Sequence, residues 1–93
     1  MGGVEDNRGG AADGDELIES AVLRQLIFLH PTQVTLEELV ADLATDPAEF
    51  AERDAIERAV RDLARAGLLH RNGDFAIPSR AAMRFNELWE AGS

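Results

Sequence analysis

The sequence predicts a single domain of the α+β class, mostly α-helical with a small β-hairpin. Apolar residues recur at helical spacing in four segments, and each segment is preceded by a Ser, Thr or Asp that can cap a helix. An Asn-Gly pair separates two short strand-like runs, which is the strongest short-range signal for a hairpin. The chain has 93 residues, enough for one small domain but too few for a large enzyme architecture.

The chain begins with a tail, residues 1–14, that we expect to be disordered. It holds five of the eight glycines and has Val4 as its only sizeable aliphatic residue, so it cannot bury enough surface to offset its ordering entropy. The domain is therefore expected over residues 15–91. Its first helix should run from Glu16 to Leu29 and end before Pro31, because the residue before a proline is disfavoured in the α region.

The second helix is marked by a capping box. Val34 has room for a short strand, and the Thr35 hydroxyl can then accept from the amide of Glu38 while the Glu38 carboxylate reaches back. A helix over Leu36–Ala44 follows from this pattern.

The third helix is expected to start at a second capping signal, with Asp46 as the cap and Pro47 at the first helical position. It should reach about Ala66, where Gly67 ends it. Its apolar residues share one arc, and the opposite arc carries arginines interleaved with Asp54 and Asp62.

A hairpin over residues 68–77 and a last helix complete the domain. A two-residue Asn-Gly turn would place His70 beside Phe75 in the hairpin. Ser79 can cap a helix over Arg80–Glu90. The apolar face of this helix consists of Ala81, Ala82, Phe85, Leu88 and Trp89.

The order helix, short strand, helix, helix, hairpin, helix resembles that of a winged helix-turn-helix domain, as found in many bacterial transcription regulators. The resemblance covers residues 16–90. It rests on the run Thr35-Leu-Glu-Glu-Leu and on the run Ala59-Val-Arg-Asp-Leu-Ala-Arg-Ala-Gly-Leu-Leu, which leads from the third helix into the hairpin. It implies a regulator that binds double-stranded DNA with its third helix in the major groove and its hairpin as the wing.

The sequence departs from this family between Leu43 and Ile56. The stretch is longer than the usual turn, so we expect the third helix to extend at its amino end. That end carries Glu49, Glu52 and Asp54, whose charges would repel DNA phosphates.

The resemblance implies a set of DNA-contacting arginines on the third helix and at the wing, because Arg suits both phosphates and guanine edges. These are Arg53, Arg58, Arg61, Arg65 and Arg71. The competing interpretation is that the arginines of the third helix form exposed ion pairs with Asp54 and Asp62.

The charge distribution favours a second hypothesis. The net charge of −9 repels nucleic acid at long range, although residues 53–84 hold seven arginines against four acidic residues. Six acidic residues lie between Glu37 and Glu52 with no basic residue among them. The alternative function is therefore a protein-interaction adaptor that binds a basic protein surface. Its acidic contact surface would comprise Glu37, Glu38, Asp42, Glu49 and Glu52.

The aromatic face of the last helix also has two interpretations. Phe85, Leu88 and Trp89 could form the seam of a homodimer, because aromatic residues dominate interfaces. They could equally complete the core of so small a domain.

The composition excludes several function classes. The chain has no cysteine, its two histidines are far apart, and no serine has a base at a recognisable spacing, so we expect no enzyme activity, metal or cofactor. The longest apolar run, Leu26–Leu29, is far shorter than a membrane span of about 20 residues. The amino terminus has no signal-peptide pattern, so a cytoplasmic location is expected. Basic residues that are all Arg, together with 15 Ala, suggest a GC-rich bacterial source.

Overall fold

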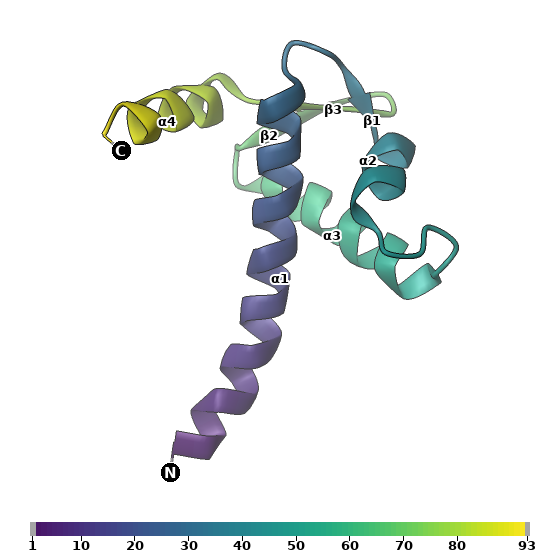
Figure 1. Ribbon diagram of the computed structural model, residues 1–93, viewed down its shortest axis with the longest axis vertical. Helices are drawn as coiled ribbons and strands as arrows, with labels where there is room; N and C mark the ends of the chain where they lie inside the picture. Colours follow the sequence, from purple (N-terminus) through teal and green to yellow (C-terminus); the bar gives the residue numbers. More distant parts are fainter. Residues whose placement is uncertain (1, 93) are drawn as a thin grey trace.

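The computed structural model describes residues 14–92 of the chain (Figure 1). This part contains four helices and three strands, and it confirms the predicted mostly helical α+β class. In chain order the elements are α1 (Gly2–Leu29, described from Gly14 onward), β1 (Val34–Thr35), α2 (Leu36–Leu43), α3 (Phe50–Arg65), β2 (Leu69–Asn72), β3 (Phe75–Pro78) and α4 (Arg80–Ala91). Apart from Gly14, the tail predicted to be disordered lies outside the described residues.

The three strands form one small antiparallel sheet in the order β1-β3-β2. The central strand β3 pairs through Ala76 with Val34 on one side and with Arg71 on the other. The short β1 therefore joins the hairpin to the segment between α1 and α2, as the sequence predicts for Val34.

The turn predicted at the Asn-Gly pair lies one residue further along the chain, which shifts the partner of each strand residue by two positions. Asn72 pairs with Phe75 and His70 pairs with Ile77, so the turn consists of Gly73 and Asp74. Gly73 has a φ of 62°, and no non-glycine residue in the described part has a positive φ. A positive φ at the first turn residue alone is typical of a type II′ turn, which places the unusual conformation on glycine at no steric cost.

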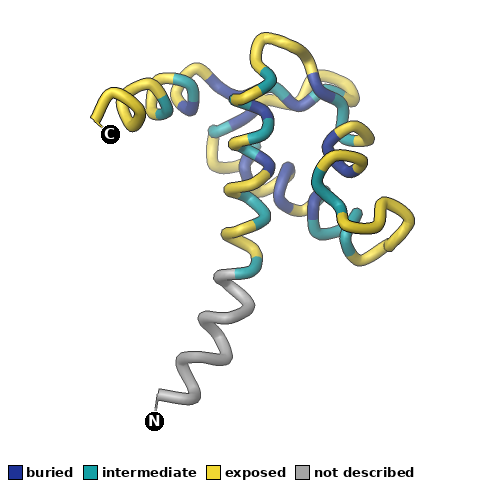
Figure 2. Tube along the Cα trace, in the orientation of Figure 1, coloured by how far each residue is buried: buried dark blue, intermediate teal, exposed yellow. Residues whose placement is uncertain are grey.

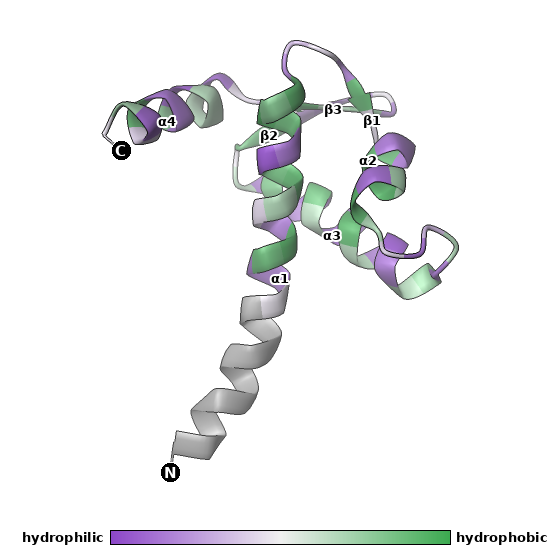
Figure 3. Ribbon diagram, viewed as in Figure 1, coloured by the Kyte–Doolittle hydropathy of each residue, from purple (hydrophilic) through white to green (hydrophobic). Residues whose placement is uncertain are grey.

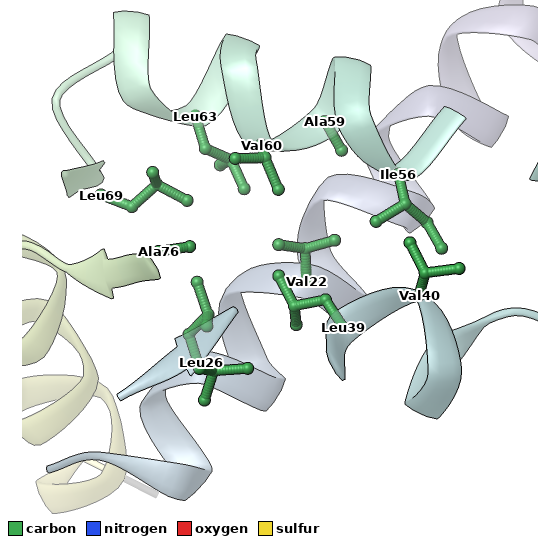
Figure 4. Close-up of a cluster of buried hydrophobic side chains, with 11 residues drawn as sticks. Val22, Leu26, Leu39, Val40, Ile56, Ala59, Val60, Leu63, Leu69 and Ala76 are labelled. Carbon is green, nitrogen blue, oxygen red and sulfur yellow. The ribbon is translucent and has the colours of Figure 1, made fainter. Parts of the chain in front are cut away.

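One apolar core contains residues from every helix and strand except α4 (Figures 3 and 4). It is built around Val22 and Leu26 of α1, with Leu39 of α2, Val60 of α3 and Leu69 of β2, each almost fully buried. The other members of the cluster are Val34, Val40, Ile56, Ala59, Leu63 and Ala76. Because α3 gives one face to this core, its opposite face is left to solvent (Figure 2).

The predicted capping of α2 and α4 is confirmed. The Glu38 N–H donates to Thr35 Oγ1 over 3.1 Å and the Thr35 N–H donates to Glu38 Oε1 over 2.8 Å. At the start of α4 the Ala82 N–H donates to Ser79 Oγ over 3.1 Å. Gly67, with a φ of 84°, ends α3 as expected.

The predicted start of the third helix at Pro47 is wrong. Residues 44–49 form a turn, and α3 begins only at Phe50. The Asp46 carboxylate accepts from the Ala48 N–H over 3.1 Å, and the Asp46 carbonyl accepts from the Glu49 N–H over 2.9 Å. An Asp side chain that bonds a backbone N–H two residues ahead favours a turn, so the capping signal serves the turn instead of a helix. The helix still extends by more than a turn before Ile56, as the long stretch after Leu43 predicts, but it begins three residues later than Pro47.

The last helix projects from the domain beyond its first turn (Figures 1 and 2). Its only buried residue is Ala82. None of the helices in the described part combines the length and the apolar character needed to cross a lipid bilayer.

Candidate nucleic-acid interface

The exposed face of α3 carries three of the arginines in the predicted DNA-binding set. Arg58, Arg61 and Arg65 all lie on the face opposite the core, and all three are exposed. With a rise of 1.5 Å per residue, they cover about 10 Å of helix length. The structure therefore places them in one row, as the helical spacing predicts.

Two of these arginines already have acidic neighbours. Arg58 Nε lies 3.5 Å from Asp54 Oδ2, and Arg65 Nη1 lies 3.6 Å from Asp62 Oδ1. Both pairs are exposed and one helical turn apart, an arrangement worth only about 0.3 to 0.5 kcal/mol. Arg58 also lines a small hollow between α1 and α3 together with carboxylates of α1, Asp15 and Glu19.

Arg61 differs from its two neighbours. Within residues 14–92 it is exposed and has no ion pair and no side-chain hydrogen bond. It is the residue of the α3 row whose five donors remain available to an external anion.

Arg53 is engaged across the helix-helix boundary. Its Nη1 and Nη2 donate to Oε1 and Oε2 of Glu37 on α2, over 3.2 Å and 2.7 Å. The hydrogen bonds and the charge of Arg53 lower the pKa of Glu37, and the same contact raises the pKa of Arg53. Such a two-bond fork fixes the geometry of both side chains. It joins Arg53 of the predicted DNA-binding set to Glu37 of the predicted acidic contact surface.

Arg71 is an exposed residue of strand β2, two residues before the turn glycine. Its Nη2 donates to the Gly73 carbonyl over 3.4 Å, and no carboxylate in the described residues pairs with it. The hairpin thus presents a positive charge beside its turn, close to where the sequence predicts one.

Most residues of the predicted acidic contact surface accept hydrogen bonds from other groups of the same chain. Glu38 caps α2, Glu37 holds Arg53, and the Glu52 carboxylate accepts from the Asp46 N–H over 2.8 Å. Asp42 accepts from Gln25 Nε2 of α1 over 3.3 Å. Glu49 is exposed, precedes α3 and makes no side-chain capping bond.

The aromatic set of α4 lies at the surface. Phe85, Leu88 and Trp89 are 64%, 54% and 68% exposed. The two rings contact each other at a centroid distance of 6.1 Å. The interpretation that these side chains complete the core is therefore wrong.

Local sequence signals could find only part of this arrangement. The capping role of Glu38 follows from a spacing of three residues, but Arg53 and Glu37 are 16 residues apart in the sequence. No signal in one sequence reveals such a pair. In the part of the chain that is described, no three His, Asp or Glu side chains gather closely enough to hold a metal ion.

Comparison of the chain with known proteins gives no match. None of the protein-family models matches it, and no curated protein or solved structure is significantly similar to it.

Proposed function

We propose that this chain is a winged helix-turn-helix domain that binds double-stranded DNA, with no enzymatic activity, as a transcription-regulator-like module. The exposed face of α3 would enter the major groove, and the β2–β3 hairpin would be the wing. The order of elements and the three-stranded sheet β1-β3-β2 support this assignment.

The observation that carries the proposal is the state of Arg61 and Arg71. Each is exposed, and neither is ion-paired within the described residues. Arg65 can join them, because an exposed pair at 3.6 Å is weak enough to exchange its carboxylate for a phosphate. Arg53 and Arg58 are less available, since one is held by Glu37 and the other faces several carboxylates.

The alternative, an adaptor that binds a basic protein through its acidic surface, has less support. Four of its five residues, Glu37, Glu38, Asp42 and Glu52, already accept hydrogen bonds within the chain. Only Glu49 is exposed without such a bond. If an adaptor function were correct, Glu49→Lys would weaken the protein contact while Arg61→Ala left it unchanged.

The test is a fluorescence titration of the folded protein against random-sequence duplex DNA at about 20 to 50 mM salt, where electrostatic binding is strongest. We expect binding that weakens steeply as salt rises. Arg61→Ala and Arg71→Ala should each weaken binding and reduce the salt slope by about 1, because each removes one phosphate contact.

Arg84→Ala is the matched control. It also lowers the net charge by one, but Arg84 lies on α4 and pairs with Glu87 at 3.2 Å. Its effect on DNA affinity should be smaller than that of Arg61→Ala. Failure of the folded protein to bind DNA at low salt, or equal effects of the two variants, would overturn the proposal.

A further inference from the structure

The helices α1 and α4 enclose an open apolar groove. It has a volume of about 1040 Å³ and is lined by residues of both helices. Its apolar lining includes Leu23 and Ile27 of α1 and Ala82, Phe85 and Trp89 of α4. A surface patch with aromatic side chains as exposed as these is typical of an interaction site.

We propose that this groove is occupied by α4 of a second copy of the chain, so that two copies form a symmetric homodimer. This inference is independent of DNA binding, because it rests on residues outside α3 and the hairpin.

The first argument is that the surface can complement itself. The projecting ridge and the groove wall are made by the same helix, since Phe85 and Trp89 line the groove and Leu88, on the same apolar face, is exposed beside them. In a twofold arrangement each copy supplies one ridge and one groove, and every contact occurs twice.

The second argument is charge. The charged residues that line the groove are Arg24 of α1 and Glu90 of α4, so this site is neutral on a chain of net charge −9. No ion pair joins the two residues within the described part of one chain. A twofold axis can place Arg24 of each copy near Glu90 of the other, which makes this the place where a second acidic chain meets least repulsion.

The third argument is area. Given the exposed fractions of Phe85, Leu88 and Trp89, these side chains offer roughly 400 Å² per copy. A standard interface buries about 800 Å² per partner. The three side chains thus supply about half of that area, so the dimer belongs to the class of small, reversible interfaces.

The test is sedimentation equilibrium of the full chain over a wide concentration range, combined with the fluorescence of Trp89, the only tryptophan. We expect a monomer–dimer equilibrium in the wild type. As concentration rises, the emission of Trp89 should shift to shorter wavelength, because dimerisation removes the exposed ring from water.

Phe85→Glu should raise the dimer dissociation constant by about 30-fold or more, the effect of losing an interface hot spot. The matched control is Phe50→Glu, which changes the charge identically at an even more exposed phenylalanine, 78% against 64%, outside the groove. Far-UV circular dichroism checks that both variants are folded. A wild type that stays monomeric with an invariant emission maximum, or a folded Phe85→Glu variant that dimerises like the wild type, would overturn the proposal.

Discussion

The acidic region around α2 and the basic face of α3 use their charges differently. In the acidic region, carboxylates bond to backbone N–H groups or to side chains of other elements, at distances of 2.7 to 3.3 Å. On α3, the acid–base pairs of Arg58 and Arg65 stay within one helix, are about half exposed or more, and have distances of 3.5 and 3.6 Å. The acidic side chains help to define the fold, whereas the arginines are left nearer to solvent.

This difference shows why net charge is a poor guide to what such a domain binds. The excess of acidic residues in the first half repels DNA at long range, but a carboxylate with hydrogen bonds inside the chain is not thereby a contact site. An exposed Arg61 without a counter-ion in the described residues is the more informative feature. Substitutions in the two regions should therefore affect different properties.

The largest expected effect is on stability, in the acidic region. Thr35→Ala removes the hydroxyl that accepts from the Glu38 N–H and should destabilise the protein by about 1 kcal/mol. In a domain of this size that lowers the melting temperature by about 4 to 8 °C, measured by thermal denaturation. DNA affinity of the folded variant should be unchanged.

Thr32→Ala is the control for this prediction. Thr32 lies in the preceding loop, is exposed, and makes no side-chain hydrogen bond within the described residues. The melting temperature of the Thr32→Ala variant should match that of the wild type. A similar loss in both variants would contradict the capping argument.

On the basic face we expect a smaller effect on stability, together with a change in the salt dependence of DNA binding. Asp62→Asn breaks the exposed pair with Arg65 and should change stability by no more than about 0.5 kcal/mol. It also frees Arg65 for a phosphate, so the salt slope of DNA binding should steepen by about 1.

Glu87→Gln provides the comparison, because Glu87 and Arg84 form the same i,i+3 pair on α4 and the net charge changes equally. DNA titrations over a range of salt concentrations should show the steeper slope only for Asp62→Asn. Equal slopes in the two variants would remove Arg65 from the interface.

The smallest expected effect is the pH dependence of the contact between Glu37 and Arg53. Because Arg53 lowers the pKa of Glu37 in the folded state, the contact stabilises the fold above the ordinary carboxyl pKa of about 4.3. That contribution is lost as the pH falls through the lowered pKa that Glu37 has in the folded state. Urea denaturation of wild type and Glu37→Gln should therefore show a gap at pH 7 that closes toward strongly acidic pH.

Arg53→Gln should show the same closing gap, because it removes the same pair of hydrogen bonds. A gap that persists after the carboxyl group is protonated would mean that packing, and not charge, accounts for the effect of Glu37→Gln.

Most of the fold could be predicted because its signals are local. The boundaries of α2 and α4 depend on Thr35 and Ser79, each of which bonds an N–H three residues ahead. The end of α3 depends on the positive φ of Gly67. The start of α3 was mispredicted because an Asp-Pro pair suits both a helix cap and a turn, and Glu52 favours the turn by accepting from the Asp46 N–H.

The candidate site was less predictable than the fold. Helical spacing placed Arg58, Arg61 and Arg65 in one row, but it could not tell which of them would be paired. The fork between Arg53 and Glu37 depends on how α2 packs against α3. Likewise, an apolar stripe on α4 has the same pattern whether the domain buries it or leaves it exposed, so only the structure shows that Trp89 lies at the surface.

Because α4 is only weakly attached, substitutions on its exposed face are separate from substitutions in the folding core. Because Ala82 is the only residue of this helix that is buried, substitutions at Phe85, Leu88 or Trp89 leave the folding core of the domain intact. The exposed surface of α4 can therefore change in shape and charge without any change to the core or to the face of α3.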